Sequence, residues 1–419
     1  MEVNIISNPL RGTITAIPSK SHVHRLLICA AFSDSPTEIL LSHSSEDIDA
    51  TVGCLCALGA KISRNGNSAH ITPIENVPEI PLLDCNESGS TFRFLLPIAS
   101  ILGKEIRFTG RGLLPSRPIG DLKTAMESGG VAFSGNQLPF AIRGKLNPGA
   151  YRLPGDVSSQ YLTGLLLALP LLGEPSSVVL ESSLQSKPYI EITLAVLRTF
   201  GTEIFRKEES YVIPPCQCGR YRSPGTIRAD GDWSNAAFFL CAGALGEPVT
   251  IEGLSQRSTQ GDKAVLDALC QFGARVECAG DCVTVSPATL HGCVLDVDDT
   301  PDLAPILSIV AACAQGETRI NRCARLRLKE SDRLKTTVEM IRSLGGNAEE
   351  NGDTLVIHGG TLSGGTVSGA GDHRIVMSAA IAAIAAKRSV TITGAEAIRK
   401  SYPTFFEDYQ SLGGEVHVL

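Results

Sequence analysis

Residues 56–73 read CALGAKISRNGNSAHITP, and residues 126–144 read MESGGVAFSGNQLPFAIRG. Both stretches run from an apolar helix end through a glycine turn into short alternating strands. The pattern recurs six times, with its turn glycines at Gly59, Gly130, Gly201, Gly273, Gly345 and Gly413. Glycine favours the left-handed turn at a helix C-terminus, and alternation indicates half-buried strands. A period of about 70 residues therefore predicts an array of α/β repeats.

A second marker runs in phase with the glycine turns. Six polar clusters each open a strongly apolar helix, near Ser21, Ser88, Ser158, Asp232, Asp302 and Asp372. Serine and aspartate favour helix starts, and helices that are apolar on all sides are expected to be buried. Each repeat is thus predicted to hold two helices and about four strands.

The repeats predict two similar lobes of three repeats each. We expect residues 14–226 to form one lobe, and residues 1–13 with 227–419 to form the other. The sixth repeat ends after one strand, so the opening segment MEVNIIS is predicted to supply its missing partner. The chain would cross twice between the lobes, near residues 11–20 and 220–230, and two crossings at one place predict a hinge.

Composition excludes several classes of protein. The 419 residues carry a net charge of −7, which argues against nucleic-acid binding. No apolar run is long enough for a membrane span, and the N-terminus lacks the pattern of a signal peptide. The 13 cysteines include no CxxC pair, so we expect reduced thiols, no zinc site and a cytoplasmic location.

The polar helix starts carry more basic and hydroxyl groups than capping requires. Free N–H groups at helix N-termini bind anions, so converging starts predict a cleft for phosphates and carboxylates. Two acids stand within this basic field, Asp302 in TPDLAP and Glu330 in LKESDR. Both are candidates for proton transfer. Asp302 has the alternative role of a helix N-cap, and Glu330 that of an ion-pair partner for a nearby arginine.

Nine motifs occur in the order and spacing of the EPSP synthase family, which this chain resembles over essentially its whole length. They are SKSHVHR (19–25), ESGSTFR (87–93), SRPIGDL (116–122), VSSQ (157–160), SKPYIEIT (186–193), TPDLAP (300–305), LRLKESDRL (326–334), GDHR (371–374) and RKSYP (399–403). The resemblance implies two lobes, each of three βαβαββ units, in an inside-out α/β barrel. It also implies transfer of the enolpyruvyl group of phosphoenolpyruvate to shikimate 3-phosphate, without a metal or an organic cofactor.

The resemblance also implies the site residues. The catalytic residues would be Asp302 as the proton acceptor, Glu330 as a second acid/base group, and Lys20, which touches both substrates. The residues implied for shikimate 3-phosphate are Lys20, Ser21, Arg25, Ser158, Ser159, Gln160, Ser186, Asp302 and Lys329. The residues implied for phosphoenolpyruvate are Lys20, Gly89, Arg117, Gln160, Arg333, Arg374 and Lys400. The substrates are the only expected partners, and the chain is expected to be a monomer.

Three positions depart from the family pattern, and two rival functions remain. Many members have Asn where this chain has Glu87, Pro where it has Phe94, and Asn where it has Arg325. Glu87 is therefore left out of the predicted site, and Arg325 is not assigned to it. One rival is UDP-N-acetylglucosamine enolpyruvyl transferase, whose marker is a cysteine in the loop that here reads GRGLLPSRP. The other is a non-catalytic ligand-binding paralogue, which loss of Lys20, Asp302 or Glu330 would indicate.

Overall fold

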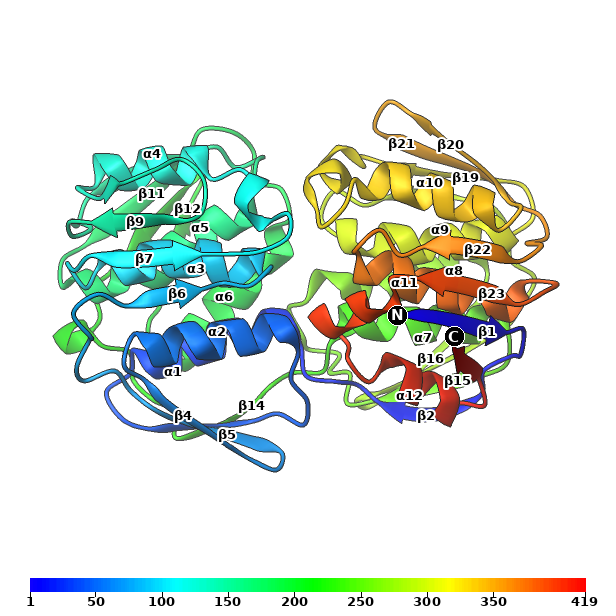
Figure 1. Cartoon of the computed structure of the whole chain (residues 1–419), viewed down its shortest axis with the longest axis horizontal. Coiled ribbons are helices and arrows are strands. Elements are labelled where there is room, and N and C mark those ends of the chain that lie inside the picture. Colours follow the sequence, from blue (N-terminus) through cyan, green and yellow to red (C-terminus); the bar gives the residue numbers. More distant parts are fainter. The chain divides into compact units, whose positions relative to one another are not determined.

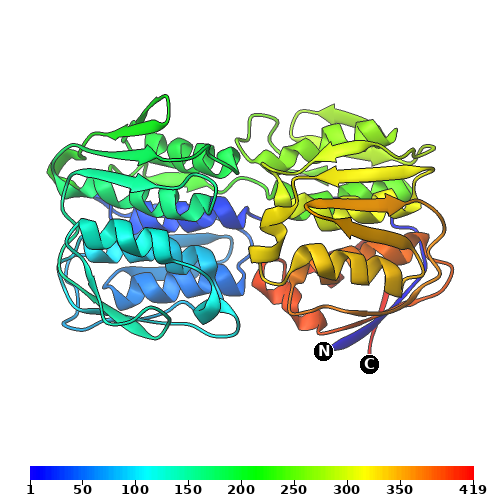
Figure 2. The ribbon, with the colours of Figure 1, turned by 90° about the horizontal axis from the view of Figure 1, so that it is seen from above.

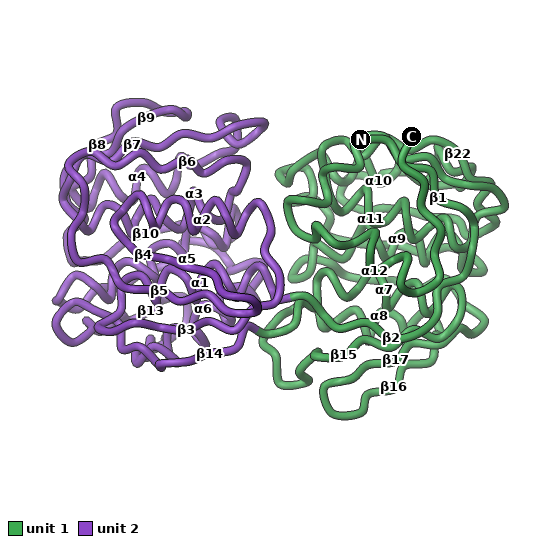
Figure 3. Tube along the Cα trace, turned by 60° about the horizontal axis from the view of Figure 1, so that its bottom comes forward, with its two compact units in different colours: residues 1–17, 230–419 green, residues 18–229 purple.

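The computed structural model describes all 419 residues and divides them into two compact units (Figure 3). Unit 1 comprises residues 1–17 and 230–419, and unit 2 comprises residues 18–229. The boundaries between the units lie a few residues after the predicted ones, because each boundary follows a strand that pairs within its own unit. Strand β2 (Gly12–Thr15) pairs with β15 (Val249–Glu252) in unit 1, and β14 (Thr226–Arg228) pairs with β3 (Thr37–Leu40) in unit 2.

Unit 2 contains three four-stranded sheets built to one plan. In the order β6-β7-β9-β8, the first two strands are parallel and the others antiparallel. The orders β10-β11-β13-β12 and β14-β3-β5-β4 repeat this plan. The strands are β4 (Lys61–Asn65), β5 (Ser68–Thr72), β6 (Leu82–Asp84), β7 (Ile106–Thr109), β8 (Ala132–Phe133), β9 (Phe140–Arg143), β10 (Ala150–Leu153), β11 (Ser176–Leu180), β12 (Phe205–Lys207) and β13 (Ser210–Ile213).

The first helices of the repeats fill the interior of unit 2, and the sheets and the second helices lie around them (Figure 1). The first helix of each repeat is almost wholly buried: in α3 (Gly89–Ser100), every residue except Ser90 is buried. Close packing at Gly164 lets α5 approach α3, since an added Cβ there would lie 2.6 Å from the Arg93 carbonyl oxygen. The other helices are α1 (Lys20–Ala31), α2 (Glu46–Ala57), α4 (Gly120–Ser128), α5 (Ser159–Ala168) and α6 (Lys187–Thr199).

Unit 1 repeats the same sheet plan, and strand β1 completes it. The order is β18-β19-β21-β20 in one sheet, β16-β17-β15-β2 in the second and β22-β23-β1-β24 in the third. Val3 of β1 lies opposite both Ile392 and Val418, so the opening segment supplies the strand that the sixth repeat lacks. The strands are β1 (Glu2–Ile6), β16 (Arg275–Ala279), β17 (Cys282–Ser286), β18 (Val294–Asp296), β19 (Glu317–Asn321), β20 (Asn347–Asn351), β21 (Thr354–His358), β22 (Gly365–Ser368), β23 (Val390–Thr393) and β24 (Glu415–Val418).

In unit 1 too, the first helix of each repeat is almost wholly buried, whereas the second helices keep an exposed face, as the helix of residues 333–343 does in Figure 2. The apolar first helices are α7 (Trp233–Leu245), α9 (Ala304–Cys313) and α11 (His373–Ala382), and the second helices are α8 (Val265–Phe272), α10 (Arg333–Ser343) and α12 (Phe405–Ser411). No helix combines the length and the hydropathy that a membrane span requires. The two units together confirm the predicted fold class, an α/β array of six repeats.

The predicted turn glycines and most predicted helix starts are present. All six glycines have positive φ, from 78° at Gly201 to 107° at Gly59, a conformation that suits glycine. Side chains cap four of the six apolar helices, at Ser88, Ser158, Asp232 and Asp372. The other two helices differ from the expectation. Helix α1 begins after Ser19, which makes no side-chain cap, and Asp302 lies in a 3₁₀ turn ahead of α9.

Candidate active site

In unit 1, the Asp302 carboxylate is surrounded by three cations. Its Oδ1 lies 2.7 Å from Arg333 Nη1 and 3.1 Å from Lys329 Nζ, and its Oδ2 lies 3.4 Å from Arg374 Nη2. Burial by itself would raise the pKa of Asp302, but Arg374, Lys329 and Arg333 lower this pKa well below its usual range. The carboxylate is therefore ionised, and it faces these cations instead of capping a helix.

Arg333 links Asp302 to two further carboxylates. It is the first residue of α10 and only 1% exposed, and its Nη2 lies 2.5 Å from Glu330 Oε2. Its Nε and Nη2 donate to the two oxygens of Asp372 at 2.7 and 3.2 Å. Burial opposes the charge of Arg333, but Asp372, Glu330 and Asp302 together raise its pKa above the usual arginine value. Glu330 thus forms an ion pair with Arg333, which is the alternative role that the sequence offered for it.

Arg374 and Lys400 lie at the edge of this cluster. Arg374 Nη2 donates to Ser234 Oγ at 2.5 Å, and its Nη1 lies 3.2 Å from the Asp302 carbonyl oxygen. Lys400 ends the 3₁₀ turn Ala395–Lys400, and its ammonium donates to the Gly371 carbonyl oxygen at 2.9 Å, directly before the GDHR aspartate. Unit 1 therefore holds one ionic network, made of Asp302, Lys329, Glu330, Arg333 and Arg374. Lys400 lies beside the start of α11.

In unit 2, Arg25 is a buried cation whose hydrogen-bond partners are uncharged. It is 2% exposed, and it donates to Thr193 Oγ1 at 2.8 Å, to the Tyr189 carbonyl oxygen at 3.0 Å and to the Ser21 carbonyl oxygen at 2.5 Å. The Phe94 ring stacks on its guanidinium, with 4.9 Å between Cζ and the ring centroid. Burial lowers the pKa of Arg25 to about 9. A buried cation with neutral neighbours favours an incoming anion.

Lys20 is the first residue of α1 and pairs with an acid that the sequence did not single out. Its ammonium lies 2.9 Å from Asp47 Oδ2, and Asp47 belongs to the first turn of α2. Both side chains are about one-sixth exposed, at 17% and 15%. Lys20 therefore lies at a helix start, as predicted, but shares its charge with a carboxylate.

Gln160 is held by residues of α3, the helix that begins with Gly89. Arg93 Nη1 donates to Gln160 Oε1 at 2.7 Å, and Gln160 Nε2 donates to Ser90 Oγ at 3.0 Å. These bonds fix the orientation of the amide, with its oxygen toward Arg93. Ser158 accepts the Gln160 N–H at 3.3 Å as the cap of α5, and Ser159, the first residue of that helix, is 6% exposed.

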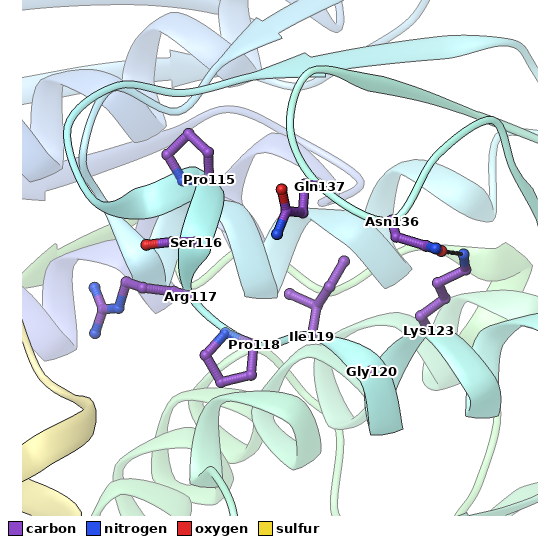
Figure 4. A pocket seen from close by; sticks show the side chains of 9 residues that line it. All are labelled: Pro115, Ser116, Arg117, Pro118, Ile119, Gly120, Lys123, Asn136 and Gln137. Carbon is purple, nitrogen blue, oxygen red and sulfur yellow. Dashed lines mark hydrogen bonds between the residues drawn. The ribbon is translucent and has the colours of Figure 1, made fainter.

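Gly89, the first residue of α3, lies in contact with the Arg117 guanidinium. A Cβ added at Gly89 would lie 2.7 Å from Arg117 Nη1 and 3.2 Å from its Cζ. Beside the Arg117 loop, a pocket of about 230 Å³ lies between the start of α4 and the Asn136–Gln137 turn. In Figure 4, the Arg117 side chain points away from Gln137, and Lys123 is bonded to Asn136. The Arg117 guanidinium lies against Gly89, and Arg117 also belongs to the lining of the pocket.

Ser186 differs from the other predicted contacts in its backbone. It precedes α6 with φ 53° and ψ 43°, in the left-handed region, and its side chain is 1% exposed. A residue other than glycine adopts this conformation at a cost, and such outliers cluster at functional sites.

Two of the three departures from the family pattern have a clear structural neighbour. The Phe94 ring stacks on the Arg25 guanidinium, and the Glu87 carboxylate packs on Gly112, where an added Cβ would lie 2.5 Å from it.

Several residues in these networks were not predicted as site residues. They are Asp47 beside Lys20, Arg93 beside Gln160, Asp372 beside Arg333 and Ser234 beside Arg374. Three of them carried a signal, because Asp372 belongs to the GDHR motif, Arg93 to ESGSTFR, and Ser234 to a polar helix start. Asp47 lies outside these motifs and is found only through packing.

Six α/β repeats in two units, with buried cations at the helix starts, define the enolpyruvyl transferase class of fold. A solved structure of that class, the enolpyruvyl transferase NikO from Streptomyces tendae, has a TM-score of 0.79 at 19% identity over 99% of this chain and 98% of its own, and it shows the fold alone. The family model of EPSP synthase (3-phosphoshikimate 1-carboxyvinyltransferase) matches residues 5–409. The chain belongs to the EPSP synthase family, the shikimate-pathway enzymes of enolpyruvyl transfer.

Individual relatives agree with the family match. A 3-phosphoshikimate 1-carboxyvinyltransferase from Clostridium kluyveri is 41% identical over 99% of this chain and 98% of its own length. One from Clostridium acetobutylicum is 40% identical over 97% of this chain and 96% of its own. The structure of EPSP synthase from Acinetobacter baumannii has a TM-score of 0.83 at 25% identity and covers both chains fully. These matches favour the EPSP synthase prediction over its sugar-nucleotide rival.

Proposed function

We propose that this chain transfers the enolpyruvyl group of phosphoenolpyruvate to the 5-hydroxyl of shikimate 3-phosphate. The 5-oxygen adds to C2 of phosphoenolpyruvate while C3 gains a proton, which gives a tetrahedral intermediate. Loss of that proton from C3 then expels phosphate and leaves the enolpyruvyl ether. The reaction requires groups that bind two multiply charged anions and groups that move two protons.

The cations of unit 2 are suited to anion binding. Arg25 contributes a buried guanidinium whose hydrogen bonds go to uncharged acceptors, so a phosphate adds the missing negative charge. We assign Arg25 to shikimate 3-phosphate together with Lys20, Ser21, Ser158, Ser159, Gln160, Ser186, Lys329 and Asp302. We assign the phosphoenolpyruvate site to Lys20, Gly89, Arg117, Gln160, Arg333, Arg374 and Lys400. An arginine matches the two oxygens of a carboxylate or phosphate in one plane.

The single observation that carries the proposal is the Asp302 carboxylate within its three cations. In the ligand-free protein, Arg374, Lys329 and Arg333 make Asp302 a weak base. When the anions of phosphoenolpyruvate draw charge from Arg333 and Arg374, the pKa of Asp302 rises. Substrate binding thereby prepares Asp302 to take the proton of the 5-hydroxyl. Water exclusion would strengthen every charge interaction in the site.

Proton transfer at C3 falls to Glu330 or Lys20 in this proposal. Glu330 is bound to Arg333, so a substrate that engages Arg333 brings C3 near the Glu330 carboxyl. Lys20, whose ammonium lies 2.9 Å from Asp47 Oδ2, is the second candidate. Exchange of solvent hydrogen into C3 distinguishes the two groups: Glu330→Gln slows exchange if Glu330 carries the proton, and leaves it unchanged if Lys20 does.

Phosphate release from phosphoenolpyruvate tests the function. We expect release to depend strictly on added shikimate 3-phosphate and to yield the enolpyruvyl ether in equal amount, by chromatography or mass spectrometry. UDP-N-acetylglucosamine serves as the alternative acceptor. Release with the sugar nucleotide in place of shikimate 3-phosphate would assign the chain to the rival activity, and release with neither acceptor would contradict both.

The finer properties of the enzyme also remain proposals. We propose that the chain acts as a monomer in the cytoplasm, where its 13 cysteines, none paired in a disulfide, stay reduced. Light scattering after size exclusion tests the monomer, and cell fractionation tests the location. The hinge stays a prediction: we expect shikimate 3-phosphate to reduce the radius of gyration in small-angle scattering, and an unchanged radius at saturation would contradict it.

A further inference from the structure

The Pro118 carbonyl group attaches the Arg117 segment to two helices of unit 2. Pro118 directly follows Arg117 and lies shortly before the start of α4 (Figure 4). Proline has no backbone N–H, so this carbonyl is its only polar group. The carbonyl oxygen accepts from the Tyr161 hydroxyl at 2.6 Å and from Arg93 Nη2 at 2.9 Å. Because a carbonyl oxygen has two lone pairs, these two donors satisfy it.

Tyr161 lies on α5 and is completely buried. Its ring lies beside the Arg93 guanidinium, with 5.6 Å between Arg93 Cζ and the ring centroid. Gly164, one turn further along α5, permits this approach, since an added Cβ there would lie 2.6 Å from the Arg93 carbonyl oxygen. Tyr161 is therefore next to both the acceptor and the second donor of the Pro118 attachment.

Arg93 joins this attachment to Gln160. Its Nη2 donates to the Pro118 carbonyl oxygen, and its Nη1 donates to Gln160 Oε1 at 2.7 Å. A guanidinium is planar and rigid, so the two bonds keep a fixed direction relative to each other. One guanidinium, with the Tyr161 ring beside it, therefore holds both the Arg117 segment and the Gln160 amide.

We propose that Tyr161 is a positioning residue for phosphoenolpyruvate, because its hydroxyl fixes the Pro118 carbonyl and thereby the backbone from which the Arg117 side chain extends. Without that hydroxyl, the carbonyl keeps only the bond from Arg93, and the Arg117 segment gains freedom. The segment must then be ordered when the substrate binds, which weakens binding. The inference rests on the proposed function of Arg117 as a ligand of phosphoenolpyruvate.

The protonation state of Tyr161 is consistent with this role. Burial raises the pKa of Tyr161 above its usual value, so the hydroxyl keeps its hydrogen at neutral pH and donates it to Pro118. Tyr161 takes no proton from either substrate in the proposed mechanism. Its loss should therefore change the binding of phosphoenolpyruvate and leave proton transfer intact, whereas a merely structural role would show no preference for one substrate.

Steady-state kinetics of the full chain test the proposal with both substrates. We expect Tyr161→Phe, which retains the ring, to raise KM for phosphoenolpyruvate about fivefold, the effect of losing one hydrogen bond. KM for shikimate 3-phosphate and kcat should stay within about twofold. Tyr221→Phe is the matched control, because Tyr221 is equally buried and donates to the Leu167 carbonyl oxygen at 2.6 Å, near the other end of α5. Both variants should lose similar stability in urea unfolding, but Tyr221→Phe should leave both KM values unchanged.

A double-mutant cycle with Arg117 gives the deciding result. In an Arg117→Met background, Tyr161→Phe should cause no further rise in KM for phosphoenolpyruvate, because it acts through the side chain that is already missing. Additive effects, equal rises in both KM values, an unchanged KM for phosphoenolpyruvate, or the same rise in Tyr221→Phe would overturn the proposal. If Tyr161→Phe fails to fold, Arg93→Lys carries the test: one ammonium cannot replace both bonds of the guanidinium, so KM for phosphoenolpyruvate should again rise. An inactive wild type would instead contradict the proposed function, and this inference with it.

Discussion

The two units carry the same fold but treat their buried cations in opposite ways. In unit 2, Arg25 donates to hydroxyl and carbonyl oxygens, Arg93 donates to an amide and a carbonyl oxygen, and Lys20 pairs with the Asp47 carboxylate. In unit 1, Arg333 alone contacts three carboxylates. One repeat architecture thus supports a site with net positive charge in one unit and a balanced ionic network in the other. We infer that unit 2 mainly binds anions, and that unit 1 combines anion binding by Arg333, Arg374 and Lys400 with the proposed base Asp302.

The strongest test of this division is Asp302→Asn. The amide keeps the shape of the side chain but cannot take a proton, so we expect turnover to fall at least about 10²-fold. Binding of shikimate 3-phosphate, measured by calorimetry, should change far less. A variant with near-normal turnover would remove Asp302 from proton transfer and leave unit 1 without its base.

Stability should separate the two arginines. Arg333→Met leaves Asp372, which is 0% exposed, without its arginine partner and removes one cation from Asp302 and from Glu330, so we expect a loss of about 3 kcal/mol. Arg25→Met removes a buried charge that lacks an acidic partner, so the ligand-free protein should lose less than about 1 kcal/mol.

Urea unfolding of the ligand-free variants measures this difference, and shikimate 3-phosphate provides its control. The ligand should stabilise the wild type by mass action but have little effect on Arg25→Met. If both variants were equally destabilised without ligand, the contrast between neutral and ionic surroundings would be wrong.

Gly89→Ala tests the contact between the start of α3 and Arg117. The new methyl group meets Arg117 Nη1 at 2.7 Å, so the guanidinium must move. We expect KM for phosphoenolpyruvate to rise about tenfold, with KM for shikimate 3-phosphate nearly unchanged. Gly120→Ala is the matched control, because a Cβ there meets nothing within 4 Å. Equal KM values for Gly89→Ala and wild type would show that Arg117 tolerates the displacement.

The smallest expected effect concerns acid stability in unit 2. Burial, with Lys20 and Arg25, holds the pKa of His24 well below 6.5, so the folded state keeps this imidazole neutral. The unfolded chain takes up a proton as the pH falls below 6.5, and the folded chain does not. Stability should therefore decline by up to about 1.4 kcal/mol per pH unit from this residue.

Substitution of His24 measures that contribution. His24→Gln retains a partner for Thr51, which lies 2.7 Å from His24 Nδ1. We expect the variant to lose less stability than wild type between pH 7 and pH 5.5 in urea unfolding. His43→Gln, at an exposed site, should behave like wild type. An unaltered pH slope in His24→Gln would place the titration elsewhere.

The sequence by itself determined the repeat architecture, because its signals are local. Turn glycines, polar helix starts and alternating strands each depend on a few neighbouring residues, and their period of about 70 residues predicted six units. The truncated sixth repeat even predicted the pairing of β1 with β24. The family motifs in turn supplied the candidate residues.

Only the tertiary structure decided which charges meet. Asp302 was equally suited to capping a helix, and its position in a 3₁₀ turn directed it to Arg333, Lys329 and Arg374 instead. Ser234 and Arg374 lie 140 positions apart in the chain, and no local pattern predicts their contact. A hydrogen bond depends on a few tenths of an ångström and on direction, which the packing of distant helices sets. Periodicity fixes which helix begins where, but the fit between helices chooses the partner of each buried charge.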